Sequence, residues 1–463
     1  MAAEAPATTV DPVTGSSLTA HERRVVWTHR AAWFLWEGQF GIHRAASTAK
    51  WLALTGGDAG LMAQYMGTSW SINSCCNLFL NPISGAVSDS YKRGPVIAFT
   101  RLGLCAYFLG QWVARRPIHM VLADTLGWGI LSAGGLAVQS AALDDMFGDR
   151  PELNSAIASA NASMAGLSGC LGPLVGILCW HRGWSNAAFL LPAVMLAVQA
   201  GLFFTCPETL RPENRVPFKP ADVLTSANPI SNLGLLLTNG PGLRRLSLAS
   251  LFYHSCTSTW SSLEAYRNDA RAIGWSPDFA SGFDSFFFLS TAFSTAVVVP
   301  RLIARWGNRK LFEIWSNVAG LAFMGVGQAW RGTSFVRRSA QYIAPAIVLQ
   351  DPWTDPCVFA LRAMVIDKGM SDVRSVGQGQ LSAAYDGLTD IVGVIMPATW
   401  GYLFSKFASA QGGILGWIGI GGHWMIAGCF RIIAGLLVRS LSRSGADGDG
   451  PAAAAAAGKD PQE

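Results

Sequence analysis

The sequence predicts an all-α integral membrane protein with twelve transmembrane helices, arranged as two pseudo-symmetric halves of six helices each. Three observations lead to this fold class. The chain of 463 residues is 51% hydrophobic and only 14% charged, whereas a soluble domain carries about 25% charged residues. Twelve apolar stretches approach the roughly 20 residues that a helix needs to cross a bilayer. Features of the first half also recur in the second, as in membrane proteins built from internal repeats.

The first half is expected to cover residues 25–206, after a cytoplasmic N-terminal tail at 1–24 that lacks the basic start and apolar stretch of a signal peptide. Each expected span is an apolar run bounded by charged, glycine-rich or proline-containing residues. The first is the weakest because it contains charges. The six spans are expected near 25–46, 59–84, 96–114, 118–142, 155–179 and 185–206.

The second half is expected to cover residues 244–438, after a polar cytoplasmic linker at 207–243. Its first and fourth spans are the weakest, because they contain charges and prolines. The tail at 439–463 is low in complexity and is expected to be disordered. The six spans are expected near 244–263, 280–304, 311–330, 340–366, 377–404 and 412–438.

The distribution of lysine and arginine predicts that both termini lie in the cytoplasm. With this orientation, the inside segments hold roughly twice as many basic residues as the outside segments, in the sense of the positive-inside rule. The acidic segment "LDDMFGDRPEL" runs against this bias. Which cellular membrane holds the protein does not follow from the sequence.

The remaining composition excludes several classes of function. The net charge of +5 is spread over short loops, so it indicates no nucleic-acid partner. The nine cysteines form no C-x-x-C pair and predict neither a disulfide framework nor a metal site. The chain contains no HExxH, no GxxxxGK[ST] and no Ser-His-Asp order, so we expect neither an enzyme nor a bound cofactor.

Two pairs of segments support an internal repeat of about 220 residues. The basic turn "GAVSDSYKRGPV" follows the second span, and "PRLIARWGNRKLF" follows the eighth. Farther along each half, Asp145 corresponds to Asp367 and Pro173 to Pro397. The two halves therefore have the same order of features.

The first of these turns resembles the signature loop of the major facilitator superfamily. Gly85, Asp89 and Arg93 match the pattern, whereas Lys92 stands where glycine is usual and Gly94 where a base is usual. The second turn keeps glycine and basic residues but lacks the acid. Its matching positions are Gly307 and Arg309, with Ala304 in place of the acid.

Other segments are similar to the tetracycline-efflux-type branch, which contains drug:proton antiporters. They are "CPETLRPENR", "IGWSPDFASGF" and "GPLVG", the last resembling the antiporter motif of the fifth span. Gly172 and Gly176 are small residues four apart that allow close helix contact, and Pro173 interrupts the helix between them. Two interpretations stay open for this motif: helix packing alone, or a direct part in coupling.

The resemblance implies a secondary transporter of a small organic solute that works by alternating access as a monomer in the lipid bilayer, with proton antiport favoured. It also implies that Asp89 and Arg93 latch the cytoplasmic side of the protein. The alternative is that these charges only anchor the topology. A uniporter, a symporter or a non-transporting receptor or scaffold remain the other hypotheses for the whole chain.

Ionisable side chains inside the expected spans are the candidates for proton or substrate binding, because charges within a membrane are costly. In the resembling family, the first, fourth, seventh and tenth spans line the cavity, and Glu37 on the first is the strongest candidate, since a buried carboxylate is readily neutralised by a proton. The candidates are Glu37, Asp124, His254, Asp351, Asp355, Asp386 and Asp390.

Each candidate has a plainer alternative. His254 is also explained as a hydrogen-bonded interior group, Asp386 and Asp390 as residues that face water, and "DPWTDP" as a segment near an aqueous mouth. The fourth span has Asp124 and lacks the arginine that is usual in drug:proton antiporters of the family. Proton antiport is therefore less firmly predicted than transport. The tryptophans mark either an interfacial belt or an aromatic pocket for a ring-bearing solute.

Overall fold

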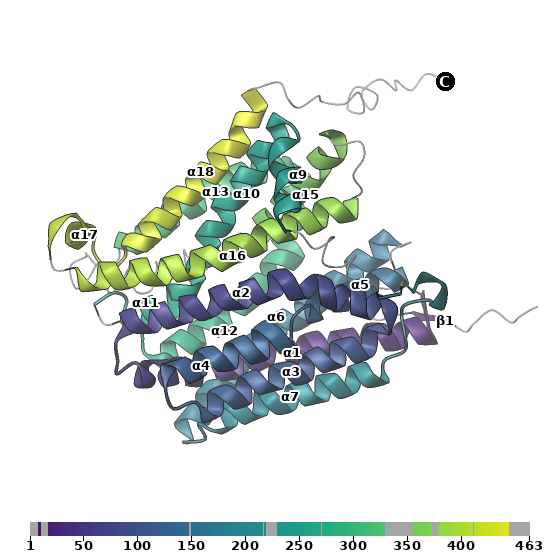
Figure 1. Ribbon diagram of the computed structural model, residues 1–463, viewed down its shortest axis with the longest axis horizontal. Helices are drawn as coiled ribbons and strands as arrows, with labels where there is room; N and C mark the ends of the chain where they lie inside the picture. Colours follow the sequence, from purple (N-terminus) through teal and green to yellow (C-terminus); the bar gives the residue numbers. More distant parts are fainter. Residues whose placement is uncertain are drawn as a thin grey trace, which may run out of the picture.

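The computed structural model describes residues 8–10, 17–147, 150–215, 217–218, 229–269, 271–328, 355–372, 378–410 and 412–443. These residues are almost entirely helical (Figure 1). The exception is a short antiparallel pair of strands before the first helix, β1 (Thr8–Val10) and β2 (Ser17–Thr19). Much of the two tails lies outside the described residues. This includes residues 444–463, for which disorder is expected from the sequence.

The first group of helices, here called the N-terminal helix group, forms the lower part of Figure 1. In it α1 packs against α6 and α7, and α3 packs against α7 and η1. Its elements are α1 (Ala20–Leu54), α2 (Ala59–Ser90), α3 (Arg93–Val113), α4 (Pro117–Ala123), the π-helix η1 (Asp124–Leu131), α5 (Gly135–Phe147), α6 (Pro151–His181) and α7 (Ala187–Thr205).

The second group, the C-terminal helix group, follows the short 3-10 helix η2 (Pro212–Asn214). Here α18 packs against α13 and α10, and α15 packs against α13. Its elements are α9 (Pro229–Thr238), α10 (Pro241–Thr257), η3 (Ser258–Ser262), α11 (Leu263–Asn268), α12 (Pro277–Phe293), η4 (Ser294–Val298), α13 (Val299–Gln328), α15 (Asp355–Asp372), α16 (Gln378–Ser409), α17 (Gly413–Ile418) and α18 (Gly422–Arg443).

Within the described residues, six helical segments have both the length and the hydropathy needed to cross a membrane. They are Arg93–Val113, Pro117–Phe147, Ala160–His181, Ala187–Thr205, Ala384–Ser409 and Gly422–Leu441. The outward faces of such helices carry large apolar side chains, including Phe99, Leu122 and Phe204, each more than half exposed. Large exposed apolar surfaces are typical of lipid-facing helices. The chain is therefore a multi-pass membrane protein.

Local sequence explains where the first two helices begin. Thr19 and Glu22 form a capping box at the start of α1: the Thr19 amide donates to Glu22 Oε2 at 2.7 Å and the Glu22 amide to Thr19 Oγ1 at 3.3 Å. Asp58 caps α2, where its Oδ1 accepts from the Leu61 amide at 3.0 Å. Both caps satisfy amide groups that a helix start leaves free.

Several expected spans are interrupted in the structure. The span expected at 118–142 contains the π-helix η1 and a break before α5. The expected boundary between 304 and 311 falls inside α13, where Gly307 has φ 70° and ψ 161°. A positive φ of this size is readily adopted only by glycine. The span expected at 412–438 is divided into α17 and α18. Of the span expected at 340–366, residues 340–354 lie outside the described part of the chain.

The two helix groups meet where α2 lies along α16 and α6 along α12 (Figure 1). A Cβ atom at Gly67 of α2 would overlap the Pro397 carbonyl oxygen, and one at Gly401 of α16 would overlap the Ala63 carbonyl oxygen. Small residues thus bring the two backbones together. These contacts lie toward the turn at residues 55–58, here called the 55–58 end; the opposite side, at Tyr91 and Lys92, is the 91–92 end.

Candidate functional site

A cavity of about 530 Å³, here called the central cavity, lies between the two helix groups. Most of its lining comes from the N-terminal group, and the C-terminal group contributes residues of η3 and α11. A cavity of this size matches the few hundred cubic ångströms of sites for small organic molecules. Its lining is Trp36, Glu37, Phe40, His43, Arg44, Ser47, Thr48, Trp51, Met66, Trp70, Asn73, Ser74, Asn77, Tyr107, Gln111, Asp124, Trp128, Leu136, Trp260, Leu263 and Glu264.

Two of the predicted site residues, Glu37 and Asp124, line this cavity. Asp124 begins the π-helix η1 and is 7% exposed. Its carboxylate accepts hydrogen bonds from Ser69 Oγ at 2.6 Å and Gln111 Nε2 at 2.5 Å. Ser47 in turn donates to Gln111 Oε1 at 3.0 Å. Asp124 is therefore held by neutral donors of α2 and α3 rather than by a base.

Glu37 differs from Asp124 because its carboxylate makes no hydrogen bond or ion pair with another described residue. The side chain is half-buried, in the middle of α1. Arg44 lies seven residues later on the same helix, which places it on the same face two turns away. A carboxylate in this position is available to a proton or to a ligand.

Aromatic rings form one wall of the cavity. The Trp128 ring lies 5.9 Å from Trp36 and 5.1 Å from Phe40, between ring centroids. Tyr107 lies 6.1 Å from Trp128. Trp36 and Trp128 therefore face the cavity, and their use as a pocket for a ring-bearing solute stays a prediction.

A group of four charges, here called the charge cluster, joins the helix groups beside the cavity; two of its side chains are buried, that of Glu264 is mostly buried, and that of Arg44 is partly exposed. Arg267 of α11 pairs with Asp284 of α12 through two hydrogen bonds of 2.9 and 3.1 Å, and with Glu264 at 2.7 Å. Arg44 of α1 reaches across to Asp284 at 3.2 Å and to Glu264 at 3.8 Å. Thr48 of α1 also donates to Glu264 at 3.2 Å. The cluster therefore connects the two groups by ion pairs and a hydrogen bond.

None of the four members of the charge cluster was predicted from the sequence. Arg44 and Asp284 lie inside the expected spans 25–46 and 280–304, so the cost of a membrane charge was a signal that could have identified both. The pairing itself could not be predicted, because Arg44 and Asp284 are far apart in the sequence.

His254, Asp386 and Asp390 are not among the described residues that line the central cavity. His254 Nε2 lies 3.0 Å from the Tyr385 hydroxyl in the buried interior of the C-terminal group, which matches the plainer alternative for this residue. Asp386 pairs with Arg362 at 3.1 Å, with both side chains well exposed. Asp390 is half-buried one turn later on α16. Asp355 is the first residue of α15, and Asp351 lies outside the described residues.

The predicted gating residues meet at the 91–92 end. Arg93 is 7% exposed and pairs with Asp89 at 2.5 Å and with Asp145 of α5 at 2.8 Å. It also donates to Ser88 Oγ at 2.6 Å. Lys92 beside it is exposed. Among the described residues, the Arg93 side chain has partners only in the N-terminal group, and its backbone amide donates to Glu208 Oε1, in the segment after α7, at 3.3 Å.

In the second turn, Gly307 interrupts α13 and Arg309 is half-buried after it. A Cβ at Gly85 or at Gly307 would meet no atom within 4 Å. Close packing against a neighbour therefore explains neither glycine. The positive φ explains Gly307, and nothing in the structure explains Gly85.

Replacing Arg93 with methionine is expected to lower the free energy of unfolding by about 1–3 kcal/mol, because Asp145 and Ser88 lose a buried partner. Lys92→Met is the matched control, since the neighbouring side chain is exposed and should change stability by less than about 0.5 kcal/mol. Thermal unfolding of the purified protein measures both. Equal effects of the two variants would instead support a role in topology alone.

The predicted packing motif of α6 lies directly against α1. A Cβ at Gly172 would lie 2.5 Å from the Gly38 carbonyl oxygen, and one at Gly176 would lie 2.7 Å from that of Ile42. Pro173 faces Gly41, whose own added Cβ would lie 2.5 Å from the proline Cδ. The three residues allow close backbone contact within the N-terminal group, beside the segment of α1 that carries Glu37.

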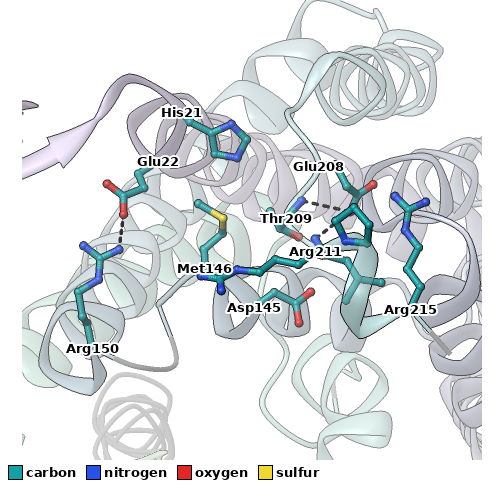
Figure 2. Close-up of a pocket in the computed structure, with 11 residues that line it drawn as sticks. His21, Glu22, Asp145, Met146, Arg150, Glu208, Thr209, Arg211 and Arg215 are labelled. Carbon is teal, nitrogen blue, oxygen red and sulfur yellow. Dashed lines mark hydrogen bonds and ion pairs between the residues drawn. The ribbon is translucent and has the colours of Figure 1, made fainter. Parts of the chain in front are cut away.

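A second cavity, of about 580 Å³, lies at the 91–92 end within the N-terminal group (Figure 2). It is bounded by the start of α1, the end of α5 and the segment after α7. Its lining mixes acids and bases, including Glu22, which pairs with Arg150, and Asp145, the partner of Arg93. This second cavity lies at the ends of helices of one group. It is therefore distinct from the central cavity, which lies between the two groups.

Metal coordination has no candidate in the described part of the chain, where no three His, Cys, Asp or Glu side chains are close enough to hold an ion. The cysteines described there, Cys75 and Cys76 among them, are free thiols.

Solved structures of membrane transporters share the fold of this chain. The human organic anion transporter MFSD10 (TETRAN) superposes with a TM-score of 0.61 at 17% identity, covering 90% of this chain and 99% of that one. A peptide transporter POT in complex with sulfate gives 0.63 at 15% identity, covering 91% and 94%. The nucleoside transporter NupG gives 0.60 at 12% identity, covering 92% and 100%. At these identities the likeness concerns the fold alone.

Two curated relatives are similar in sequence. Major facilitator superfamily domain-containing protein 10 of Mus musculus is 28% identical over 174 residues, which cover 37% of this chain and 36% of that protein. The match thus spans about a third of the mouse protein. Tetracycline resistance protein, class H, of Pasteurella multocida is 23% identical over 360 residues, which cover 76% of this chain and 83% of that protein. A model of the Major Facilitator Superfamily matches residues 42–349, and the chain belongs to this superfamily of membrane transporters.

Proposed function

We propose that this protein is a proton-coupled secondary transporter that moves a small organic solute by alternating access, with antiport favoured. The observation that carries the proposal is the central cavity, which lies between the two helix groups and is lined by Glu37 and Asp124. Ionisable groups at a membrane-depth cavity are the usual means of linking a solute to protons. A non-transporting scaffold would not need such a cavity.

The proposal includes the arrangement of twelve helices in two halves, residues 25–206 and 244–438, joined by a cytoplasmic linker at 207–243. The separate packing of the N-terminal and C-terminal helix groups supports it. Both termini are placed in the cytoplasm, so the 91–92 end is the cytoplasmic end. In this proposed orientation the contacts of α2 with α16 and the charge cluster lie on the outer side, so a state closed at that side would open toward the cytoplasm.

Glu37 is proposed as the proton-linked carboxylate. It lines the cavity without a hydrogen-bonding partner among the described residues, and it lies on α1, which packs against both α6 and α7. A proton on Glu37 and a solute in the same cavity would compete for one carboxylate. Such competition is the physical basis of antiport, because binding of one ligand then favours release of the other.

The names of the similar proteins do not agree on a substrate. They mention tetracycline resistance, organic anions, nucleosides and peptides. None of these substrates is therefore proposed for this chain, and its substrate is proposed only as a small organic solute. A uniporter or symporter with the same fold is the alternative mechanism.

The test is a transport assay with the full chain in proteoliposomes, using a panel of radiolabelled solutes with and without an imposed pH gradient. Coupled transport predicts solute accumulation that depends on the gradient and disappears when a protonophore collapses it. Solute equilibration that ignores the gradient would indicate a uniporter. Failure to move any solute across a broad panel would contradict the proposal and support a scaffold.

A further inference from the structure

The charges around the central cavity do not balance. Its lining contains four ionisable Asp, Glu, Lys or Arg side chains: Glu37, Arg44, Asp124 and Glu264. Arg44 and Glu264 belong to the charge cluster, in which two arginines face two carboxylates, so the cluster is neutral as a whole. Glu37 and Asp124 remain, and neither forms an ion pair with a described base. Without added protons the lining residues therefore carry an excess of negative charge, while the buried Arg101 guanidinium lies outside the lining, 4.2 Å from the centroid of the Trp36 ring.

A further lining side chain is a hydrogen-bond acceptor without a donor. Asn73 of α2 is 8% exposed, and its Oδ1 has no hydrogen-bond partner among the described residues. A buried acceptor that lacks a partner costs free energy until a ligand supplies one. The Glu37 carboxylate, also without a hydrogen-bonding partner, is an acceptor too. Glu37 and Asn73 thus call for a positively charged group or a donor, and His43 Nε2, a third lining atom without a partner among the described residues, donates or accepts according to its tautomer.

The aromatic wall is a second feature that favours a positively charged ligand. Trp36, Phe40 and Trp128 are mutually packed at centroid distances of 5.1–5.9 Å, and all three line the cavity. Aromatic faces attract cations through their quadrupole, and aromatic cages are common in the recognition of quaternary ammonium groups. The same faces stack against a ring of the ligand.

We propose that the central cavity selects a ring-bearing organic cation, whose positive group faces Glu37 and Asn73 and whose apolar part packs on Trp36, Phe40 and Trp128. The inference rests on the proposed function, since it names the class of solute that the transporter carries. A cation also competes directly with a proton for Glu37, which fits antiport.

The experiment compares two probes of the same shape and opposite charge, tetraphenylphosphonium and tetraphenylborate. Equilibrium binding is measured on the full chain in lipid nanodiscs without a proton gradient, after subtraction of binding to empty nanodiscs. Saturable binding of the phosphonium, with affinity at least about tenfold above that of the borate, is the expected result. Equal binding of both ions, or tighter binding of the borate, would overturn the proposal.

Variants then locate the site. Glu37→Gln should weaken phosphonium binding by about tenfold or more, whereas Glu313→Gln, which alters a carboxylate on α13 outside the cavity lining, should leave it unchanged. Trp128→Phe keeps an aromatic face and should retain more binding than Trp128→Leu. If both glutamate variants bind the phosphonium as tightly as the unmodified protein, the cation does not bind at Glu37 and the proposal fails.

These outcomes are separable from those of the transport assay. Phosphonium binding without gradient-dependent transport of any solute would leave this inference standing and remove proton coupling. Gradient-driven transport confined to anionic or neutral solutes would support the proposed function and overturn the inference.

Discussion

Arg267→Leu is expected to destabilise the protein by about 3–5 kcal/mol, because it leaves the buried carboxylates of the charge cluster without their main partner. The Arg267 and Asp284 side chains are each 4% exposed and share two hydrogen bonds. Glu264 would lose a 2.7 Å ion pair as well. The free energy of unfolding, from thermal or denaturant unfolding in detergent, measures the loss.

The loss of stability is expected because buried carboxylates are left without a positive partner. An arginine whose acidic partner is exposed therefore serves as the control. Arg362 of α15 pairs with Asp386 at 3.1 Å, and there the two side chains are 38% and 58% exposed. Arg362→Leu should therefore cost no more than about 1 kcal/mol. The double variant Arg267→Leu with Asp284→Asn should recover part of the loss, because it removes both charges. If Arg267→Leu is no more destabilising than Arg362→Leu, the cluster is not a buried ion network.

Gly401→Leu is expected to abolish transport by preventing closure at the 55–58 end. In this state a Cβ at Gly401 would overlap the Ala63 carbonyl oxygen, so a leucine fits only if α2 and α16 separate. Overpacking of a close contact costs about 1–3 kcal/mol, which shifts a two-state equilibrium by roughly 5- to 150-fold. The protein should then populate the state that is open at this end.

Distances between spin labels test this shift directly. Labels on Leu61→Cys and Tyr402→Cys, both on exposed positions of α2 and α16, should lie farther apart in Gly401→Leu, in a background without native cysteines. Gly387→Leu is the matched control on α16, because a Cβ at Gly387 meets nothing within 4 Å. The control should keep both the label distance and transport. An unchanged distance in Gly401→Leu, together with normal transport, would rule out the proposed role of this crossing.

Six of the twelve expected spans coincide with described helical segments that are long and apolar enough to cross a membrane, because such spans depend on the length and polarity of local segments. The stretch expected at 96–114 is helix Arg93–Val113, and that at 185–206 is Ala187–Thr205. Breaks within helices were harder to foresee. The π-helix at Asp124–Leu131 has no signal in hydropathy, and Gly307 marks a break whose positive φ is a property of the backbone and not of composition.

The site was predictable only in part, for a related physical reason. Glu37 and Asp124 were found because a charge inside an apolar stretch is conspicuous on its own. The charge cluster was missed because its meaning depends on partners from α1, α11 and α12 that only packing brings together. Gly172 and Gly176 were identified as a close-contact motif, yet their partner, α1, could not be inferred from spacing.

Solute-driven proton movement into proteoliposomes tests most directly whether Glu37 links the proton to the solute. A lumenal pH dye follows it for the unmodified protein, Glu37→Gln and Glu313→Gln. We expect proton flux in the unmodified protein and in Glu313→Gln, and none above background in Glu37→Gln. Exchange of labelled for unlabelled solute at saturating concentration should remain measurable in Glu37→Gln. Proton flux that survives in Glu37→Gln at the level of the control would contradict the central claim that this carboxylate links the proton to the solute.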